Sequence, residues 1–278
     1  MIDKSVFIRR LICTVTSFVL ALCLMCMALI STVFIASGKS FIAFAEDKSD
    51  YAEYSLVTLK TELEYLAELG KFSPDFFSSQ IDEELYKSRV SEAFLANIKG
   101  DSLSYNIESV SKEFYDMTAK YVLAVDGEIL PEDEDGLRGL SVECAQAYIK
   151  YSNPASVKLV VKYFPKIRKI LLFAAIGVAI LLFASVFLLV KLCFGKDLSK
   201  HLIFAFSGAS LLSGVLPATL LLSKEINKIS LTLPALHSFV VTFFEGVLKI
   251  PCFISLAFLV VSITLLVIKF VKITKAKE

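Results

Sequence analysis

Hydrophobic positions along this chain gather into long uncharged runs near both ends, with a polar stretch between them. The run at residues 170–190 contains no charged side chain, and at a rise of about 1.5 Å per residue it is just long enough to cross a hydrocarbon layer of roughly 30 Å. Comparable runs occur before and after the polar stretch. We therefore predict an all-α membrane protein with transmembrane helices at residues 11–37, 167–190, 202–222 and 250–268.

Between the first two spans, one-sided apolar stripes predict amphipathic helices. The first stripe consists of Leu56, Leu59, Leu63 and Leu66. Its 3-4-3 spacing is that of one helix face, and Gly70 follows as a natural helix end. Further stripes lie within residues 82–98, 107–121 and 137–151. Because each stripe is narrow, the helices must bury their stripes against one another, so we predict a helical-bundle domain at residues 38–166.

Short local signals predict where these helices begin and end. Ser73-Pro74-Asp75 combines a cap, a proline suited to the first turn and an acid for the positive end of the helix dipole, which predicts a helix start. Asn153-Pro154 predicts a break before a further helix at residues 155–168. That helix is expected to lead into the second span, with Pro165 as a kink or break.

The segment between the third and fourth spans is apolar but interrupted by polar residues. Residues 233–248 contain His237 and Glu245, so we predict an interfacial or re-entrant helix within an outer loop at residues 223–249. Its apolar face is a candidate interaction face formed by Leu233, Leu236, Val240, Phe243 and Phe244. We hypothesise that this face docks on the outer domain and that the two act as one unit over the membrane.

Small residues line one face of the third span at 3-4-4 spacing. They are Ser207, Ser210, Gly214 and Ala218. Small side chains let membrane helices approach closely, so this is a candidate helix-packing face. A substrate path along the same face is the alternative interpretation.

Composition and charge support a membrane protein with an acidic domain. The chain is 56% hydrophobic, against about 45–50% apolar in ordinary soluble domains. Residues 46–164 contain 23 acidic and 12 basic side chains, although the net charge of the whole chain is only +1. Because phosphate binding needs a positive surface, this excess of acid excludes nucleic acid from the expected partners and leaves the lipid bilayer and a protein partner.

Basic residues beside the spans predict the orientation. Ten lie on the side that carries the N-terminus and seven on the other, which favours a cytoplasmic N-terminus. We therefore expect a multi-pass plasma-membrane protein with both termini in the cytoplasm and residues 46–165 outside. The cytoplasmic segments would be residues 1–10, 191–201 and 269–278. The basic start, the apolar run and Ala43-Phe44-Ala45 also fit a cleaved signal peptide, but the length of the run favours a retained anchor.

The cysteines and histidines do not form a known motif. Cys144 is the only cysteine of the polar domain, so that domain is expected to lack an internal disulfide. Cys23 and Cys26 form a C-x-x-C, but within an apolar helix where thiolate chemistry is disfavoured. The predicted topology places His201 and His237 on opposite sides of the membrane, where they cannot share a metal ion.

Other chemistry is equally absent from the sequence. It has no zinc-protease, nucleophile-elbow or phosphate-loop motif, and the uncharged runs of its predicted spans, at residues 11–37, 170–190, 202–222 and 250–268, carry no Asp, Glu, Lys or Arg. The acidic stretch at residues 132–136 lacks the ligand spacing of a calcium-binding EF-hand, so we predict a solvated acidic loop that caps the next helix. We therefore expect no catalytic residue, no metal site and no cofactor, and we predict that the protein is not an enzyme.

Two resemblances concern the whole layout. The stretch Phe72-Ser73-Pro74-Asp75-Phe76-Phe77 and the later acidic turn resemble those of uncharacterised four-span membrane proteins of Gram-positive bacteria with a helical extracytoplasmic domain. One span, a large outer domain and three further spans also resemble the topology of single-subunit ABC-type permeases of the cell-division and lipoprotein-export kind.

The function predicted is a non-enzymatic envelope protein whose outer domain binds or senses a protein partner. The alternative is a permease-like subunit of an ATP-driven transport or mechanotransmission complex.

Overall fold

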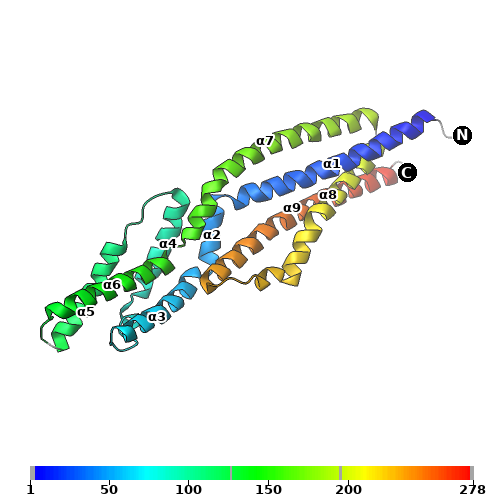
Figure 1. Ribbon diagram of the computed structural model, residues 1–278. Helices are drawn as coiled ribbons and strands as arrows, with labels where there is room; N and C mark the ends of the chain where they lie inside the picture. Colours follow the sequence, from blue (N-terminus) through cyan, green and yellow to red (C-terminus); the bar gives the residue numbers. More distant parts are fainter. Residues whose placement is uncertain (1–3, 126, 194–195, 276–278) are drawn as a thin grey trace. The chain divides into compact units, whose positions relative to one another are not determined.

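The computed structural model describes residues 4–125, 127–193 and 196–275, and these residues form helices and connecting turns without a β-strand. Figure 1 shows the order of the elements along the chain. The helices are α1 (Lys4–Ala36), α2 (Lys39–Lys48), α3 (Tyr51–Leu69), α4 (Glu83–Lys99), α5 (Ile107–Val125), α6 (Pro131–Ser152), α7 (Ala155–Leu192), α8 (Lys196–Ser223) and α9 (Pro234–Lys275), with 3-10 turns η1 (Ser78–Gln80) and η2 (Glu225–Lys228).

Among the described residues, four helices are long and apolar enough to cross a membrane. The spanning stretches are Phe7–Ala36 in α1, Val161–Leu192 in α7, Asp197–Ser223 in α8 and Pro234–Val271 in α9. This confirms the prediction of an all-α chain with four apolar helices of spanning length and is compatible with a multi-pass membrane protein. Parts of the predicted cytoplasmic segments, namely residues 1–3, 194–195 and 276–278, lie outside the described residues.

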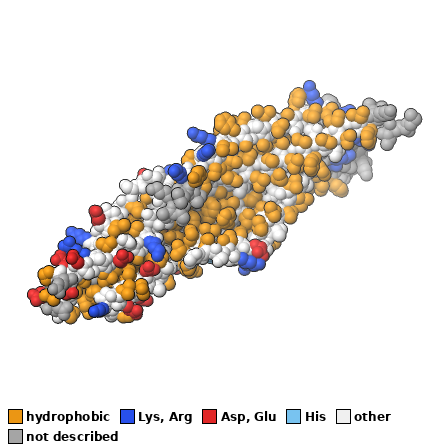
Figure 2. Space-filling view, in the orientation of Figure 1, with side chains coloured by type: hydrophobic (Ala, Val, Ile, Leu, Met, Phe, Trp, Pro, Cys, Tyr) orange, Lys and Arg blue, Asp and Glu red, His pale blue; other side chains and the backbone are white. Residues whose placement is uncertain are grey.

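The chain divides into two compact units. The apolar unit contains Met1–Phe41, Phe164–Ile229 and Phe243–Glu278, and the acidic unit contains Ile42–Tyr163 and Ser230–Thr242. Hydrophobic side chains cover most of the visible surface of the apolar unit, whereas Asp and Glu side chains gather on the acidic unit (Figure 2). The chain passes from one unit to the other within α2, α7 and α9.

The core of the acidic unit is built from the stripes read in the sequence. Leu59 and Leu63 of α3 are fully buried, and α3 packs against both α4 and α6. Phe114 of α5 contacts the ring of Phe77 at 5.6 Å and that of Tyr148 of α6 at 6.3 Å between centroids. The helices thus bury one another's apolar faces, as expected for amphipathic helices of a bundle.

The predicted helix start at Ser73-Pro74-Asp75 is wrong. The chain forms turns there and then the 3-10 turn η1, and α4 begins only after Asp82. The Asp82 carboxylate accepts a hydrogen bond from the backbone N–H of Leu85 at 3.0 Å, and this contact caps the start of α4. Phe76 and Phe77 are instead buried, so side-chain burial decides the path of this segment.

Two other segments differ from the sequence prediction. Residues 234–248 are helical as predicted, but they do not form a helix of their own, because α9 continues through Pro251 into the apolar stretch that follows. Its first turns are stabilised by burial in the acidic unit, where the Phe239 ring lies 5.2 Å from that of Phe94. The acidic stretch at residues 132–136 is not a loop but the first turns of α6, with Pro131 at the start.

Within the apolar unit, α1 packs along α8 and is held at one end by α7. The Arg168 guanidinium of α7 donates hydrogen bonds to the backbone oxygen of Phe34 at 3.2 Å and to the hydroxyl of Ser37 at 3.1 Å. The bond to Phe34 satisfies a backbone oxygen in the last turn of α1, at the negative end of the helix dipole. At the other end, the Arg9 guanidinium donates to the backbone oxygen of Leu192, the last residue of α7.

Candidate functional site

The acidic unit has a groove where α3 and α5 end and α6 begins. Its volume is about 580 Å³. The apolar part of its wall is formed by Leu66, Leu69, Phe72, Val122, Leu137 and Leu140. Three charged side chains, Lys71, Asp133 and Glu143, also line it. A mixed wall of this kind offers hydrophobic area for affinity and charges for orientation of a ligand.

The turn after α3 shapes this groove. Gly70 donates its N–H to the oxygen of Leu66 at 3.0 Å, and Phe72 donates to the oxygen of Ala67 at 2.9 Å. Lys71 between them has a φ of 62°, the left-handed conformation that ends many helices. The chain therefore reverses sharply, and the Phe72 ring stacks on Phe76 at 4.8 Å between centroids.

Gly70 is needed for close packing rather than for its backbone angles. Its φ of −77° is accessible to any residue. A Cβ at this position would lie 2.5 Å from a methyl carbon of Leu140 in α6. The absence of a side chain thus lets the turn approach α6 and sets the width of the groove.

A polar cluster elsewhere in the acidic unit connects α4, α5 and α6. The Arg89 guanidinium makes a two-pronged ion pair with Glu113, with hydrogen bonds of 2.7 and 3.1 Å, and donates to the hydroxyl of Tyr148 at 3.3 Å. It also lies 5.3 Å from the ring centroid of Tyr105. The hydrogen bonds to Glu113 raise the pKa of Arg89. Because its donors are directed at these neighbours, the cluster holds helices together and is not a free binding site.

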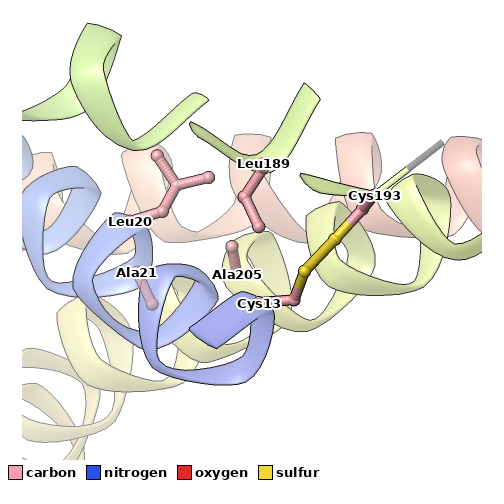
Figure 3. Packing of buried hydrophobic residues seen from close by; sticks show 6 residues of the cluster. All are labelled: Cys13, Leu20, Ala21, Leu189, Cys193 and Ala205. Carbon is pink, nitrogen blue, oxygen red and sulfur yellow. A yellow bond between two sulfur atoms is a disulfide. The ribbon is translucent and has the colours of Figure 1, made fainter. Parts of the chain in front are cut away.

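The apolar unit contains a second candidate site, at one end of α1. Cys13 of α1, Cys193 just after α7 and His201 of α8 bring their ligand atoms within 4.8 Å of one another. Both cysteines are buried, with 2% and 4% of their surface exposed, and His201 is half-buried. Figure 3 shows the sulfurs of Cys13 and Cys193 pointing toward each other and joined in a disulfide. The two cysteines belong to a buried hydrophobic cluster with Leu20 of α1, Leu189 of α7 and Ala205 of α8 (Figure 3).

Ser17 connects the histidine of this site to α1. Its hydroxyl is fully buried one turn after Cys13 and donates a hydrogen bond to the Cys13 backbone oxygen at 2.7 Å. The same hydroxyl lies 2.9 Å from Nδ1 of His201. Since its one proton is used toward Cys13, the hydroxyl accepts from His201, and Nδ1 carries the imidazole proton.

The residues of the predicted interaction face are divided between the units. Leu233, Leu236 and Val240 belong to the acidic unit, and Phe243 and Phe244 belong to the apolar unit. Within the acidic unit the buried positions are instead Ala235 and Phe239, and Ser238 donates a hydrogen bond to the backbone oxygen of Ser49. In the apolar unit, Phe243 contacts Phe41 edge-on at 5.5 Å. The start of α9 therefore packs through neighbouring positions of the helix, and Leu233 and Phe244 stay exposed.

The predicted small-residue face of α8 lies against α9. Ser207 shares a hydrogen bond of 2.7 Å with Ser262, and Ser210 and Ser255 each donate to the other's backbone oxygen at 2.9 and 2.8 Å. A Cβ on Gly214 would lie 2.2 Å from the Ser255 hydroxyl oxygen. Ala218 borders a pocket of about 280 Å³ on the same side.

The Cys13, Cys193 and His201 cluster was missed in the sequence. Cys23 and Cys26, which form the C-x-x-C of the sequence, are free cysteines within α1 and belong to no group of three metal-ligating side chains among the described residues. The sequence did contain a signal for this cluster. Cys13, Cys193 and His201 each lie near the end of a predicted span, and the predicted topology places these three ends on the same side of the membrane. Positions distant in sequence can meet at such an end.

Comparison with known proteins adds no relative. No protein-family model, curated protein or solved structure matches this chain. The two resemblances drawn from the layout therefore stay predictions, and the function has to be argued from the site geometry.

Proposed function

We propose that the protein is a membrane-anchored binding protein whose acidic unit holds a segment of a protein partner. The observation that carries this proposal is the groove at the ends of α3, α5 and α6, with its apolar wall and mixed charges. The same helix ends carry Leu69, Val125 and Leu130, each more than half exposed. Exposed hydrophobic side chains gathered beside a concave surface are typical of interaction sites.

The charges of the groove define the chemistry of the partner. The groove is lined by two carboxylates, Asp133 and Glu143, and one amine, Lys71. The surrounding residues 46–164 carry 23 acidic and 12 basic side chains. A segment that combines apolar side chains with lysine or arginine is complementary to this surface. The proposed partner is therefore a protein with an exposed apolar segment flanked by basic residues.

Crosslinking in cells tests the proposal directly. A photoreactive amino acid at Leu69, which is exposed at the groove, should crosslink to the partner, and mass spectrometry of the adduct identifies the captured segment. We expect the captured peptide to contain apolar residues flanked by Lys or Arg. A photoreactive residue at Tyr65, also exposed on α3 but not lining the groove, is the control and should give at least tenfold less of the same adduct.

Charge reversal separates the groove from the general acidity of the unit. The double variant Asp133→Lys and Glu143→Lys should abolish the adduct, because the basic segment would then meet like charges. The double variant Glu64→Lys and Asp116→Lys changes the net charge equally at exposed positions that do not line the groove, and should leave the adduct in place. Equal loss in both variants, or no adduct at Leu69, contradicts the proposal. Co-purification of an ATPase with the unmodified protein would instead favour the permease-like function.

A further inference from the structure

We propose that Cys13, Cys193 and His201 form a binding site for Zn²⁺ when the two cysteines are in the thiol state. Their ligand atoms come from three separate segments of the apolar unit and lie within 4.8 Å of one another. Two thiolates and one imidazole nitrogen are a common ligand set for zinc, and they leave the fourth tetrahedral position to water. The site is independent of the groove and of the function proposed for the acidic unit.

Ser17 prepares the histidine for metal binding. Because Nδ1 donates its proton to the Ser17 hydroxyl at 2.9 Å, the lone pair of the neutral imidazole is on Nε2. A hydrogen bond from the second ring nitrogen is the usual way in which proteins fix the tautomer and orientation of a zinc-binding histidine. Ser17 is fully buried, so water does not compete for this contact.

The charge balance of the cluster favours a divalent ion. Two thiolates carry a charge of −2, the neutral imidazole carries none, and Zn²⁺ brings the total to zero. The apolar neighbours Leu20, Leu189 and Ala205 would make a net charge costly here. A monovalent ion such as Cu⁺ would leave one negative charge uncompensated.

The disulfide in the structure is the oxidised state of the same site. A sulfur in a disulfide is not a thiolate and does not bind zinc, so the site opens only after reduction. In that step two thiols of a cellular reductant transfer two electrons and two protons to the Cys13–Cys193 bond, which gives two cysteine thiols and the reductant's own disulfide. Zn²⁺ then displaces the two thiol protons. Reducing conditions are those of the cytoplasm, the side on which the predicted topology places these residues.

Metal analysis of the full-length protein in detergent tests the site. The protein is reduced with a phosphine, incubated with Zn²⁺ and desalted, and its zinc content is measured. We expect about one zinc per chain after reduction and none in protein kept oxidised. Co²⁺ in place of Zn²⁺ should give the thiolate-to-metal absorption band of a cysteine site, a readout that does not depend on any activity.

Matched variants assign the ligands. Cys13→Ser and Cys193→Ser should each remove the Co²⁺–thiolate band or weaken it strongly, and His201→Gln should weaken zinc binding. The control is Cys23→Ser with Cys26→Ser, which removes two free cysteines of α1 and should leave zinc binding unchanged. Ser17→Ala should weaken zinc binding by about 10–100-fold through loss of the contact to His201, whereas Thr16→Ala, at the neighbouring buried position, should not.

The outcomes separate the alternatives. Reduced wild-type protein without bound zinc, or zinc binding that survives loss of Cys13 and Cys193, overturns the proposal. If the Cys23→Ser and Cys26→Ser control loses its zinc, the metal is bound by those cysteines, and the proposal is overturned as well. If a cysteine variant does not purify as folded protein, the His201→Gln and Ser17→Ala variants, which keep all cysteines, decide the question. Unchanged zinc affinity in both of these excludes the proposed site.

Discussion

Buried polar side chains of the acidic unit are hydrogen-bonded to each other across its helices. Tyr86 is fully buried in α4 and donates its hydroxyl to Ser55 of α3 at 3.1 Å. Tyr105 donates to the Ser152 hydroxyl of α6 at 3.2 Å. Such hydrogen bonds offset the cost of removing hydroxyl groups from water. A single substitution in this core therefore changes the stability of the unit both through packing and through lost hydrogen bonds.

Phe114 is the position where a charge should be least tolerated. It is buried between Phe77 and Tyr148, so Phe114→Asp would place an unpaired carboxylate in the core. We expect it to destabilise the acidic unit by more than the about 3–5 kcal/mol typical of Phe→Ala in a core. Thermal unfolding of the full-length protein measures the effect. Tyr65→Asp, at an exposed position of α3, should stay within about 0.5 kcal/mol. If Phe114→Asp had the same thermal midpoint as the wild type, the apolar stripe of α5 would not be part of the core.

Glu46 should make the stability of the acidic unit depend on pH. Burial is the main cause that raises the pKa of its carboxyl above 4.5, against a hydrogen bond from Ser91 that lowers it. The folded state therefore holds this proton more tightly than the unfolded state. The proton of Glu46 favours the folded state below the pKa of the unfolded chain, and this contribution to stability is lost as the pH rises through the higher pKa of the folded state.

Replacing this carboxyl by an amide removes the cost of burying its charged form. We expect Glu46→Gln to be more stable than the wild type at pH 7 and to lose the Glu46 part of the pH dependence, because the amide oxygen still accepts from Ser91. Thermal midpoints between pH 4 and pH 8 measure both effects. Glu64→Gln, at an exposed position of α3, is the control and should follow the wild type. A Glu46→Gln curve parallel to the wild type contradicts the assignment.

At the scale of elements, hydroxyl pairs and a glycine hold α8 against α9. Ser210 and Ser255 exchange hydrogen bonds with each other's backbone, and Gly214 lies in contact with the same Ser255. In lipid, no hydrophobic driving force brings helices together, so close approach and such bonds decide the packing. The contact therefore depends on the absence of a side chain at position 214.

Gly214→Ala should weaken this helix pair. The added Cβ would lie 2.2 Å from the Ser255 hydroxyl and 2.8 Å from its Cβ, so one of the helices has to move. We expect a lower thermal midpoint in detergent, partly restored by combining Gly214→Ala with Ser255→Gly. Gly177→Ala on α7 is the control, because a Cβ there has open space, and it should be neutral or slightly stabilising. Destabilisation of equal size at both glycines would argue against the contact.

At the scale of the whole molecule, the flanking charges predict the orientation in the membrane. In a background without other cysteines, Ser102→Cys should react with a membrane-impermeant maleimide in intact cells. Lys275→Cys should react only after the cells are permeabilised. This result is expected because ten basic residues flank the predicted inner side and seven the outer side. The reverse pattern would invert the predicted topology and place the cysteine–histidine site on the outer side.

The sequence alone determined the helices and their boundaries wherever local chemistry is strong. Uncharged runs of spanning length predict α1, α7, α8 and the second part of α9, since the bilayer imposes length and apolarity on any span. Asp82 and Gly100 mark the two ends of α4, because the cap bond and the φ of 84° at Gly100 are properties of a few adjacent residues.

Only the tertiary structure decided where distant segments meet. Burial of Phe239 against Phe94 makes residues 234–242 the start of α9 rather than a separate interfacial helix. Burial of Phe76 and Phe77 overrides the helix-start signal at Ser73-Pro74-Asp75. Cys13, Cys193 and His201 are up to 188 positions apart in the sequence and share a site because three helices end together. Such contacts depend on packing between elements, and no local pattern in the sequence encodes them.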